Sequence, residues 1–306
     1  MINYKSEYAG VSCKFSPLKP NILSCCFSEN YGIIGKGKLL VFSFNNDKTN
    51  KKLTKEKELL FENCLTDLEF SPEKDNVIFV GDNSGFVYFV DFVNNKITSK
   101  FPVHKKDILS LSTKENLLVT TCSNGTAKIF DINNANLLIK YDKCFNNSPV
   151  TYANFHPNEK NIVSFTNLNG NCFIFDMRKS GIPVKCFVNN VGLTSCSFSD
   201  SSILLSDTSG LIHLYDLRKD NNIPVKSFVG HKLTCKKVKF TLNNAQTFVS
   251  CGYDMNLYKW NINNSLPIKE YNHHSEFVTG FDLSQQDQSG LICSTSFDKT
   301  VDLFYL

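Results

Sequence analysis

The sequence lacks the segments that would place the protein in or across a membrane. No apolar run approaches the ~18–20 residues that a membrane-spanning helix needs. The first ten residues, MINYKSEYAG, contain no apolar segment of the kind that a secretory signal carries. The sequence therefore predicts a soluble, intracellular protein with no direct membrane insertion.

An excess of charge of one sign is also missing. The 33 Lys and Arg residues nearly balance the 29 Asp and Glu residues. They are scattered except in NNDKTNKKLTKEKE (45–58), which we expect on a solvated loop or an edge strand. Because a nucleic-acid-binding surface needs a more concentrated positive charge, we expect no nucleic-acid partner.

The 12 cysteines lack the spacing of a metal site or a redox motif, since no C-x-x-C pair occurs. They fall inside apolar segments such as LSCCFS (23–28) and VTTCSN (119–124). In a reducing compartment such a cysteine behaves as a small buried hydrophobe. We therefore predict neither a disulfide framework nor a zinc site, and no cofactor.

What the sequence does contain is a repeat. Its units end in an aromatic or apolar residue followed by Asp or a substitute, as in GTAKIFDI (125–132), GNCFIFDM (170–177) and GLIHLYDL (210–217). The Asp-equivalent positions recur at intervals of 40 to 48 residues: 43, 91, 131, 176, 216, 261 and 305. A period near 40–45 residues with a W-D-like ending is typical of a four-stranded propeller blade.

The repeat predicts an all-β chain, folded as a single seven-bladed WD-repeat β-propeller over residues 1–306. The blades are expected at approximately 10–58, 59–103, 104–146, 147–188, 189–229, 230–271, and 272–306 plus 1–9. The last unit ends after its third strand, and residues 1–9 are otherwise unassigned. We expect these residues to supply the missing strand, so that no sheet edge stays open.

The stretch ENYGIIGKGKLLVF (29–42) has three glycines before an apolar run, which suits either a phosphate-binding loop or a turn. A dinucleotide loop must open a helix so that its amides meet the phosphates. Nothing helical follows KLLVF (38–42), which favours the turn. The repeat assigns Gly37 the turn position held elsewhere by Gly85, Gly125, Gly170 and Gly210.

Several polar residues fit the buried hydrogen-bond network of a WD repeat, in which a His, a strand Ser, a turn Asp and the Trp satisfy one another. His231, Asp254 and Trp260 occupy these places in the sixth blade, and His274 and Asp298 in the seventh. A metal site in HHSEF (273–277) is the alternative for the latter.

Catalytic residues are not evident. No serine has a histidine at a spacing that would make a nucleophile–base pair. We predict no catalytic residue, no metal and no enzymatic activity.

Particular motifs resemble those of one family. They are NYGIIGKGKLLVF (30–42), ENCLTDLEF (62–70), GHKLTCKKVKF (230–240), SCGYDMNLYKWN (250–261) and HHSEFVTGFDLS (273–284). Together they resemble peroxin-7, the WD-repeat receptor for the type 2, amino-terminal peroxisomal targeting signal. The first of them is the most specific, because its glycine-rich turn is absent from generic propellers.

The resemblance implies a peroxisomal import receptor that is cytoplasmic and shuttles to the peroxisome matrix. Its cargo signal would be a nonapeptide, [RK]-[LVI]-x5-[HQ]-[LA], docked as an amphipathic helix on one face of the propeller. The implied partners are type 2 cargo proteins, a peroxin-5-like or peroxin-20-like co-receptor, and the peroxisomal docking complex.

The basic first residue of such a signal requires an acidic, partly apolar groove. Asp107 matches an acidic position of the family groove, and Glu62, Asn63 and Glu276 are expected on loops of the same face. The family has an Asp where this chain has Asn63, so Asn63→Asp is expected to tighten binding without disturbing the fold. Each of these carboxylates also suits an ordinary solvated loop.

Two other functions remain as alternatives. FDMR (175–178) and YDLR (215–218) resemble the D-x-R ends with which WD-repeat substrate receptors dock on a cullin-4 ubiquitin ligase adaptor. Such ends also occur in plain propellers, where the Arg is expected to pair with a carboxylate of a neighbouring blade. An enzyme is the second alternative and needs a convergent polar site.

Overall fold

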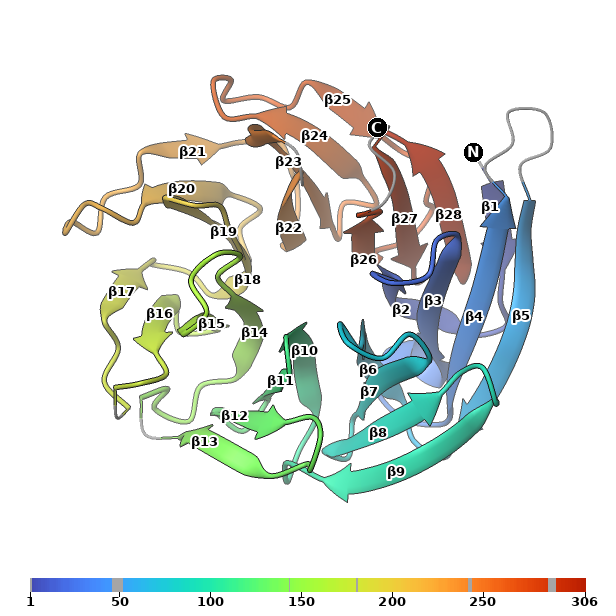
Figure 1. Ribbon diagram of the computed structural model, residues 1–306. Coiled ribbons are helices and arrows are strands. Elements are labelled where there is room, and N and C mark those ends of the chain that lie inside the picture. The colour runs from blue at the N-terminus through green and yellow to red at the C-terminus, as the bar shows by residue number, and fades with distance from the viewer. Residues whose placement is uncertain (1, 46–51, 143, 180, 242–243, 286–289) are drawn as a thin grey trace. The chain divides into compact units, whose positions relative to one another are not determined.

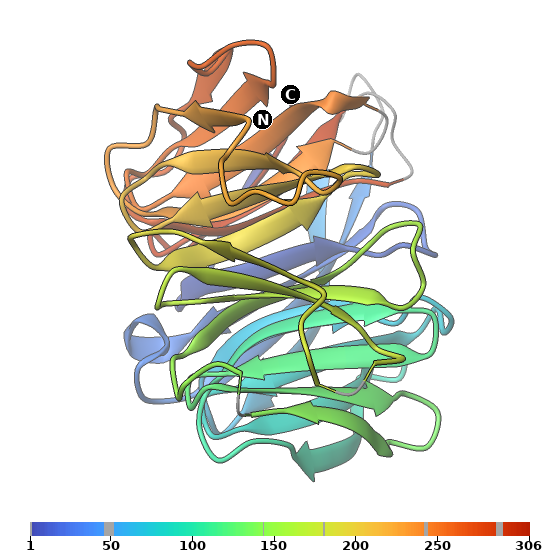
Figure 2. The ribbon, with the colours of Figure 1, turned by 90° about the vertical axis from the view of Figure 1, so that its left-hand side faces the viewer.

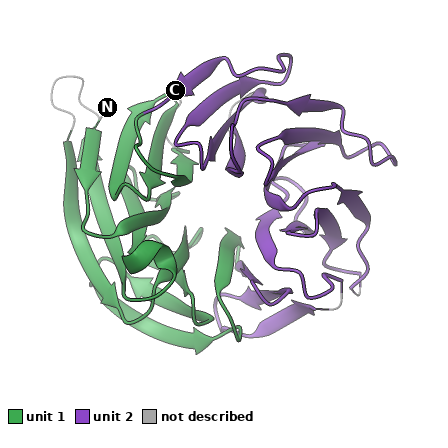
Figure 3. Ribbon diagram, turned by 180° about the vertical axis from the view of Figure 1, so that it is seen from behind, with its two compact units in different colours: residues 1–116, 273–306 green, residues 117–272 purple. Residues whose placement is uncertain are grey.

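The computed structural model describes residues 2–45, 52–142, 144–179, 181–241, 244–285 and 290–306. Among these residues it has 28 β-strands and one short 3₁₀ turn, η1 (Glu29–Gly32), and no α-helix. The chain divides into two compact units, which Figure 3 shows in green and purple. Unit 1 comprises residues 1–116 and 273–306, and unit 2 comprises residues 117–272.

Unit 1 contains three four-stranded sheets. In spatial order, their strands are β1 (Ile2–Lys5), β28 (Thr300–Tyr305), β27 (Leu291–Ser296) and β26 (Val278–Leu283); β2 (Ala9–Phe15), β3 (Ile22–Ser28), β4 (Gly37–Asn45) and β5 (Lys52–Phe61); and β6 (Leu65–Phe70), β7 (Val77–Asp82), β8 (Phe86–Asp91) and β9 (Lys96–Pro102). The unit also holds β10 (Ile108–Lys114).

Unit 2 likewise contains three four-stranded sheets. Their strands are β14 (Val150–Phe155), β15 (Ile162–Asn167), β16 (Asn171–Asp176) and β17 (Lys185–Val188); β18 (Leu193–Phe198), β19 (Ser202–Asp207), β20 (Ile212–Asp216) and β21 (Lys226–Phe228); and β22 (Cys235–Thr241), β23 (Asn244–Gly252), β24 (Leu257–Asn261) and β25 (Lys269–Tyr271). It also holds β11 (Leu117–Cys122), β12 (Thr126–Asp131) and β13 (Leu137–Tyr141).

In the described residues the strand order thus groups all strands into seven four-stranded sheets, labelled in Figure 1. Sequential antiparallel strands joined by short turns are the composition of a propeller blade. The predicted fold class, an all-β seven-bladed WD-repeat propeller, is confirmed.

The predicted closing strand is confirmed as well. β1 pairs antiparallel with β28, with Ile2 opposite Leu303 and Lys5 opposite Thr300. The side chain of Asn3 also donates to the buried carboxylate of Asp302. β1 therefore covers the backbone edge that β28 would otherwise expose.

The core of unit 1 lies between its sheets. One cluster joins the sheet β2–β5 to the sheet that holds β26–β28. It includes four fully buried residues, Phe27, Phe42, Cys293 and Val301. Ten of the 12 cysteines are buried, in keeping with their expected role as small hydrophobes. Burial raises the pKa of Cys25 and of Cys293 well above its usual value, which favours the protonated thiols.

The lysine-rich segment 45–58 lies partly outside the described residues. Asn45 ends β4, and residues 52–58 belong to β5, the outermost strand of its sheet, with a mixture of exposed and half-buried side chains. Lysines on an edge strand discourage pairing with another chain. The expected edge strand is therefore present from Lys52 onward.

Candidate functional site

The loops at one end of the unit 1 strands form the candidate site, which we call the loop face. It consists of residues 6–8, 29–36, 62–64, 83–85, 103–107, 273–277 and 297–299. Hydrogen bonds tie neighbouring loops together: Asn83 N–H donates to Cys64 O at 3.0 Å, and His104 N–H donates to Gly85 O at 2.9 Å. The N–H of Phe297 donates to Phe277 O at 3.0 Å in the same way.

The most distinctive part of the loop face is the 29–36 loop between β3 and β4. The Glu29 carboxylate accepts the N–H of Lys36 at 2.7 Å, which closes the loop across its base. Asn30 and Tyr31 both have left-handed backbone angles (φ 44° and 58°), an arrangement that costs free energy in residues other than glycine. Gly35 has φ 119°, a backbone angle that residues with a side chain rarely adopt, and a Cβ there would also lie 2.8 Å from Glu29 Cβ, so glycine is required.

This loop corrects the role assigned to Gly37. The four expected turn glycines have positive φ values: Gly85, Gly125, Gly170 and Gly210. Gly37 instead lies in β4, paired with Ser28, so the prediction that it shares their turn position is wrong. The reason is that the β3–β4 connection is an extended loop, whose turn glycines are Gly32 and Gly35. Gly37 is needed because a Cβ would approach the Leu65 side chain to 2.5 Å.

The 29–36 loop presents three large apolar side chains to solvent. Tyr31, Ile33 and Ile34 are 57%, 79% and 69% exposed. The Tyr31 ring is supported by Phe297, against which it packs edge-on with the ring centroids 5.2 Å apart. The side chain of Asn83 donates to Ile33 O at 3.2 Å. An apolar surface of this kind, fixed in place, is suited to contact another molecule.

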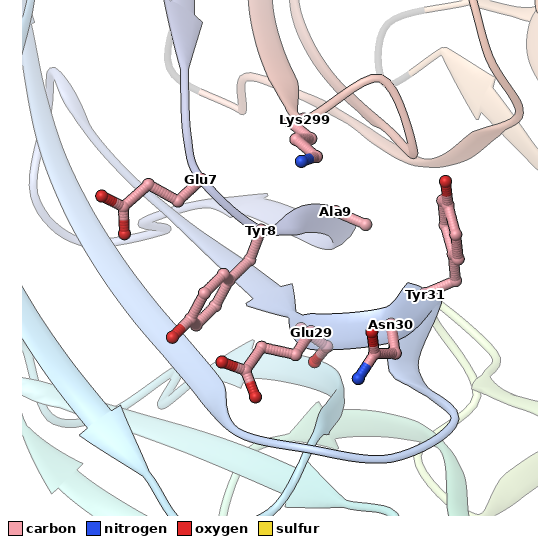
Figure 4. A pocket seen from close by; sticks show the side chains of 8 residues that line it. Glu7, Tyr8, Ala9, Glu29, Asn30, Tyr31 and Lys299 are labelled. Carbon is pink, nitrogen blue, oxygen red and sulfur yellow. The ribbon is translucent and has the colours of Figure 1, made fainter.

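A cavity of about 410 Å³ opens beside this loop (Figure 4). Its walls include Tyr8, Glu29, Tyr31 and Lys299, and Glu7 lies at its rim. A hydrogen bond between Tyr8 and Glu29 raises the pKa of the tyrosine. The pKa of Glu29 is lowered, chiefly by the backbone N–H of Lys36, so this carboxylate stays ionised. The cavity therefore combines a fixed negative charge with aromatic rings.

Three of the four predicted peptide-binding residues lie on the loop face with exposed side chains. Asp107 directly precedes β10, and Glu62 lies three residues before the start of β6. Glu276 precedes β26, and its backbone oxygen accepts the hydroxyl of Ser296 at 3.0 Å. The structure places these three carboxylates on loops of one face and leaves them available to a ligand.

Asn63 has a different position from the other three. Its side-chain amide donates to Asp82 Oδ2 at 2.8 Å, and the Tyr88 hydroxyl donates to the same oxygen at 2.9 Å. Asp82 is fully buried and also accepts the N–H groups of Ser84 and Phe86. Burial and the adjacent Asp82 raise the pKa of Tyr88. In this arrangement the Asn63 amide is a hydrogen-bond donor to the buried carboxylate of Asp82 and does not face a ligand.

The predicted structural network of the sixth blade is brought together in unit 2. His231 Nδ1 lies 2.8 Å from Asp254 Oδ1, and its Nε2 lies 2.7 Å from Ser250 Oγ. The indole N–H of Trp260 donates to the same Ser250 oxygen at 2.8 Å, and Trp260 is fully buried. Burial would raise the pKa of Asp254, but the bonds from His231 and backbone N–H groups outweigh it and lower the pKa.

The seventh blade, in unit 1, has the same arrangement without the tryptophan. His274 Nδ1 lies 3.0 Å from Asp298, and its Nε2 lies 2.8 Å from Ser294 Oγ. Burial opposes ionisation of Asp298, yet the bonds from His274, Thr300 and Ser275 hold its pKa below the usual value. His274 therefore has hydrogen-bond partners on both ring nitrogens, and the residues that the structure describes contain no group of His, Cys, Asp and Glu fit to hold a metal.

Sequence reasoning missed a second form of this network. In the second and fifth blades the buried carboxylate comes two positions earlier, at Asp82 and Asp207. The amide of Asn189 donates to Asp207 at 3.0 Å, as Asn63 does to Asp82. The shared signal is D-x-S-G, at 82–85 and 207–210. Both Asn residues precede a first strand, where the other form has its histidine.

The part of the chain that the structure describes contains no helix with the length and apolar character that a membrane crossing requires.

The arginine of each D-x-R end is paired within its own motif. Arg178 forms a two-bonded pair with Asp176, and Arg218 forms one with Asp216, each with a shortest distance of 2.7 Å. The expected pairing with a neighbouring blade is therefore wrong, because the carboxylate two residues earlier lies within reach.

Comparison with known proteins supports the repeat and suggests a function. A family profile described as "WD domain, G-beta repeat" matches residues 95–131. The peroxisomal targeting signal 2 receptor of Schizosaccharomyces pombe is 24% identical over 301 residues, which cover 96% of this chain and 96% of that receptor. The receptor of the same name from Saccharomyces cerevisiae is 23% identical, with 97% of each chain covered.

Similarity extends to a WD protein with another name. The histone acetyltransferase type B subunit 2 of Candida glabrata is 23% identical over 262 residues, covering 76% of this chain and 61% of that subunit. The matches to the two receptors cover nearly the full length of this chain and of each receptor, whereas the match to the acetyltransferase subunit covers only part of each protein. The chain is therefore similar over nearly its whole length to proteins named as peroxisomal targeting receptors.

Proposed function

We propose that this protein is a non-catalytic import receptor, which binds the amino-terminal type 2 peroxisomal targeting signal on the loop face of unit 1. The observation that carries the proposal is the combination on one face of fixed apolar side chains (Tyr31, Ile33 and Ile34) with exposed carboxylates. An amphipathic helix with basic and aliphatic side chains on one side is complementary to that combination.

Charge assigns the roles within the site. The basic first residue of the signal is received by Asp107, since a charge-assisted bond contributes about 1.5–3 kcal/mol. Glu62 and Glu276 contribute to the negative potential at longer range. The aliphatic residues of the signal pack on Ile33 and Ile34, which the strained 29–36 loop holds in place without further ordering on binding.

The remaining surface of the helix needs a second protein. A helix lying on a face leaves its opposite side in water, and the co-receptor, of the peroxin-5-like or peroxin-20-like kind, covers it. With that partner the receptor engages the peroxisomal docking complex and shuttles between cytosol and peroxisome. The similarity to the two yeast receptors supports this cycle.

The test is binding of a fluorescently labelled nonapeptide of the type 2 pattern, measured by anisotropy with and without a candidate co-receptor. The control peptide carries Ala in place of its basic first residue. The proposal expects binding that depends on that residue and weakens as salt rises, because exposed charges are screened. It also expects Asp107→Lys to abolish binding. Equal affinity of the wild type and Asp107→Lys for both peptides would refute the acidic site.

A second binding experiment on this protein distinguishes the import-receptor function from the ligase alternative. A ligase substrate receptor would bind a cullin-4 adaptor through Arg178 and Arg218, whose guanidinium groups are occupied by Asp176 and Asp216. Capture of the adaptor that is lost in Arg178→Ala and Arg218→Ala, with no peptide binding, would favour that function. No observation in the structure favours it now.

A further inference from the structure

A repeated apolar surface lies on unit 2 and shares no residue with the loop face of unit 1. Three segments before the fourth strands of consecutive sheets read Ile-Pro-Val-Lys (182–185), Ile-Pro-Val-Lys (223–226) and Leu-Pro-Ile-Lys (266–269). In each, the first aliphatic side chain is strongly exposed: Ile182 by 72%, Ile223 by 67% and Leu266 by 66%. The second aliphatic residues, Val184, Val225 and Ile268, are about half exposed.

The three segments occupy the same position in their sheets. The aromatic residues Phe187, Phe228 and Tyr271 pair with Cys172, Ile212 and Leu257 of the third strands. Each aliphatic pair lies three and five residues before its aromatic residue. In the sheet β6–β9 of unit 1, Phe101 holds that place, and the corresponding residues are Thr98 and Lys96. The exposed pairs are thus a property of these three sheets and not of every blade.

Hydrogen bonds make the surface continuous. The side chain of Asn222 donates to Val188 O and accepts Val188 N–H, both at 2.8 Å, which brings Ile223 beside the exposed Val188. In the next sheet Val229 N–H donates to Ser265 O at 3.1 Å, which brings Leu266 beside the exposed Val229. We call these three aliphatic pairs, together with Val188 and Val229, the aliphatic row. Figure 2 faces this side of unit 2, where the fourth strands run from yellow to orange.

The row is rigid before any partner arrives. Each pair encloses a proline, which fixes its own φ. The second aliphatic residue is tied to the third strand, since Val184 N–H donates to Ile174 O and Val225 N–H to Leu214 O, both at 2.7 Å. An apolar surface that is already ordered loses little entropy on binding. Because Asn222 occupies the backbone groups of Val188, a partner cannot pair with the edge of β17 at that residue and would meet the row there through side chains.

The charge beside the row indicates the partner. Residues 176–188, 216–229 and 259–271 contain eight basic and four acidic residues, a net charge equal to the +4 of the whole chain. Arg178 and Arg218 are already paired with Asp176 and Asp216, whereas Lys179 and Lys219 are exposed. An acidic surface would therefore be attracted to this side of unit 2.

We propose that the aliphatic row is a docking surface for an acidic segment of a partner protein that carries aliphatic side chains on one face. The basic residues draw the segment to unit 2, and the row buries its apolar side chains. This surface is separate from the peptide site proposed above and does not depend on it.

The probe for the proposal is a random dodecapeptide display library, selected on the immobilised protein. Peptides are counter-selected on a row variant with Ile182→Ser, Ile223→Ser and Leu266→Ser. A control variant removes three exposed apolar side chains elsewhere, with Leu60→Ser, Val93→Ser and Leu168→Ser. Both variants must keep the thermal midpoint of the wild type, which is expected because all six side chains are at least 43% exposed.

The proposal expects peptides rich in Asp, Glu and aliphatic residues, whose affinity falls at least tenfold in the row variant and stays unchanged in the control variant. Lys179→Glu with Lys219→Glu should weaken the same peptides. Recovery of no row-dependent peptide, or of basic ones, would overturn it. So would row-dependent sedimentation with vesicles containing 30 mol% phosphatidylserine, which would indicate a membrane, or a dimer lost in the row variant, which would indicate a second copy.

Discussion

Two polar clusters, in different sheets, lie at the connection between the second and third strands of a blade. They provide its hydrogen bonds with different residues. The Trp260 cluster of unit 2 uses His231, Ser250, Asp254 and Trp260. The Asp82 cluster of unit 1 uses Asn63, Asp82 and Tyr88, with the carboxylate fully buried. In both, a residue just before the first strand is bonded to a turn carboxylate. The comparison teaches that a position is structural when its side chain faces the turn, whatever its chemistry suggests.

The comparison also separates fold from function within unit 1. Asn63 and Glu62 are neighbours in sequence, but Asn63 faces Asp82 and Glu62 faces solvent. Asp107, on the next loop, is likewise exposed. Stability should therefore respond to changes in the two clusters, and ligand binding to changes in the exposed carboxylates. Each prediction below tests one side of that division.

The largest effect is expected for Trp260→Ala. The indole is fully buried against Phe228 and Phe248, so its removal leaves a large cavity and deprives Ser250 Oγ of one hydrogen-bond donor. The free energy of unfolding should fall by about 3–5 kcal/mol. Urea denaturation measures it, and Trp260→Phe, which keeps most of the packing, should cost clearly less. An indole emission maximum typical of a solvated tryptophan would contradict the burial.

Removal of residues 2–5 is expected to have the next largest effect. It takes away the half-buried Ile2 and Tyr4 and uncovers the edge of β28. The loss should be roughly 2–3 kcal/mol, from partial burial of two apolar side chains and the ladder bonds. Thermal denaturation measures it, with Lys5→Ala as a control in the same strand. An unchanged midpoint would show that β1 does not stabilise the sheet.

Asp107→Ala tests the other side of the division. It should weaken nonapeptide binding by roughly one to two decades, at ~1.4 kcal/mol per decade, while the thermal midpoint stays the same. The reason is that the side chain is exposed and, in the function proposed above, receives the basic first residue of the signal. Anisotropy titration and thermal denaturation on the same samples measure both. A stability loss with unchanged affinity would reverse the assignment.

Asn63→Asp is expected to have a smaller effect, on the fold. The new carboxylate would lie against buried Asp82, where the amide now donates at 2.8 Å. The variant should lose about 1–2 kcal/mol at neutral pH, because a buried acceptor loses its donor and gains a like charge. Asn189→Asp, which meets Asp207 in the same way, should match it, and Glu62→Gln should be neutral. Tighter peptide binding with full stability would restore the original expectation for Asn63.

The Trp260 cluster and the Asn63→Asp variant should depend on pH with opposite signs. The pKa of Asp254 is lowered in the folded protein, so its contribution is present above the unfolded pKa of about 3.9 and is lost as pH falls further. In Asn63→Asp one carboxyl pKa is raised instead, so this variant should recover stability relative to the wild type as pH falls from 7 towards 4. Denaturant titrations at several pH values measure both, with Asp254→Asn as the control that removes the wild-type effect.

The sequence predicted the parts of the fold that repeat. The recurring aromatic–Asp ends located the sheets, and the unassigned residues 1–9 located the closing strand. The 29–36 loop could not be derived in this way, because the repeat aligned Gly37 with turn glycines and concealed the extended connection. That loop is closed by the hydrogen bond from Lys36 N–H to the Glu29 carboxylate, which no periodicity records.

For the candidate site residues, the sequence predicted the loop on which each one lies but not the direction of its side chain. The sequence placed Asn63 and Asp107 before first strands, and both lie there. It could not show which of them turns inward, since that depends on the carboxylate of Asp82, placed two positions away from the expected turn acid. Asn63 has a buried hydrogen-bond partner and Asp107 is exposed to solvent. This difference arises only when the neighbouring strands are assembled.

Pairing of β1 with β28 also determines when folding can finish. Residues 2–5 meet residues 300–303, so this contact joins segments almost 300 residues apart in the chain. During synthesis the other sheets of unit 1 can begin to form as their strands emerge from the ribosome, whereas β1 has to wait until β28 is made. Contacts between distant segments form slowly. The nascent chain therefore carries an unpaired β1 until residues 300–303 have been made, and this extended segment stays uncovered during that interval.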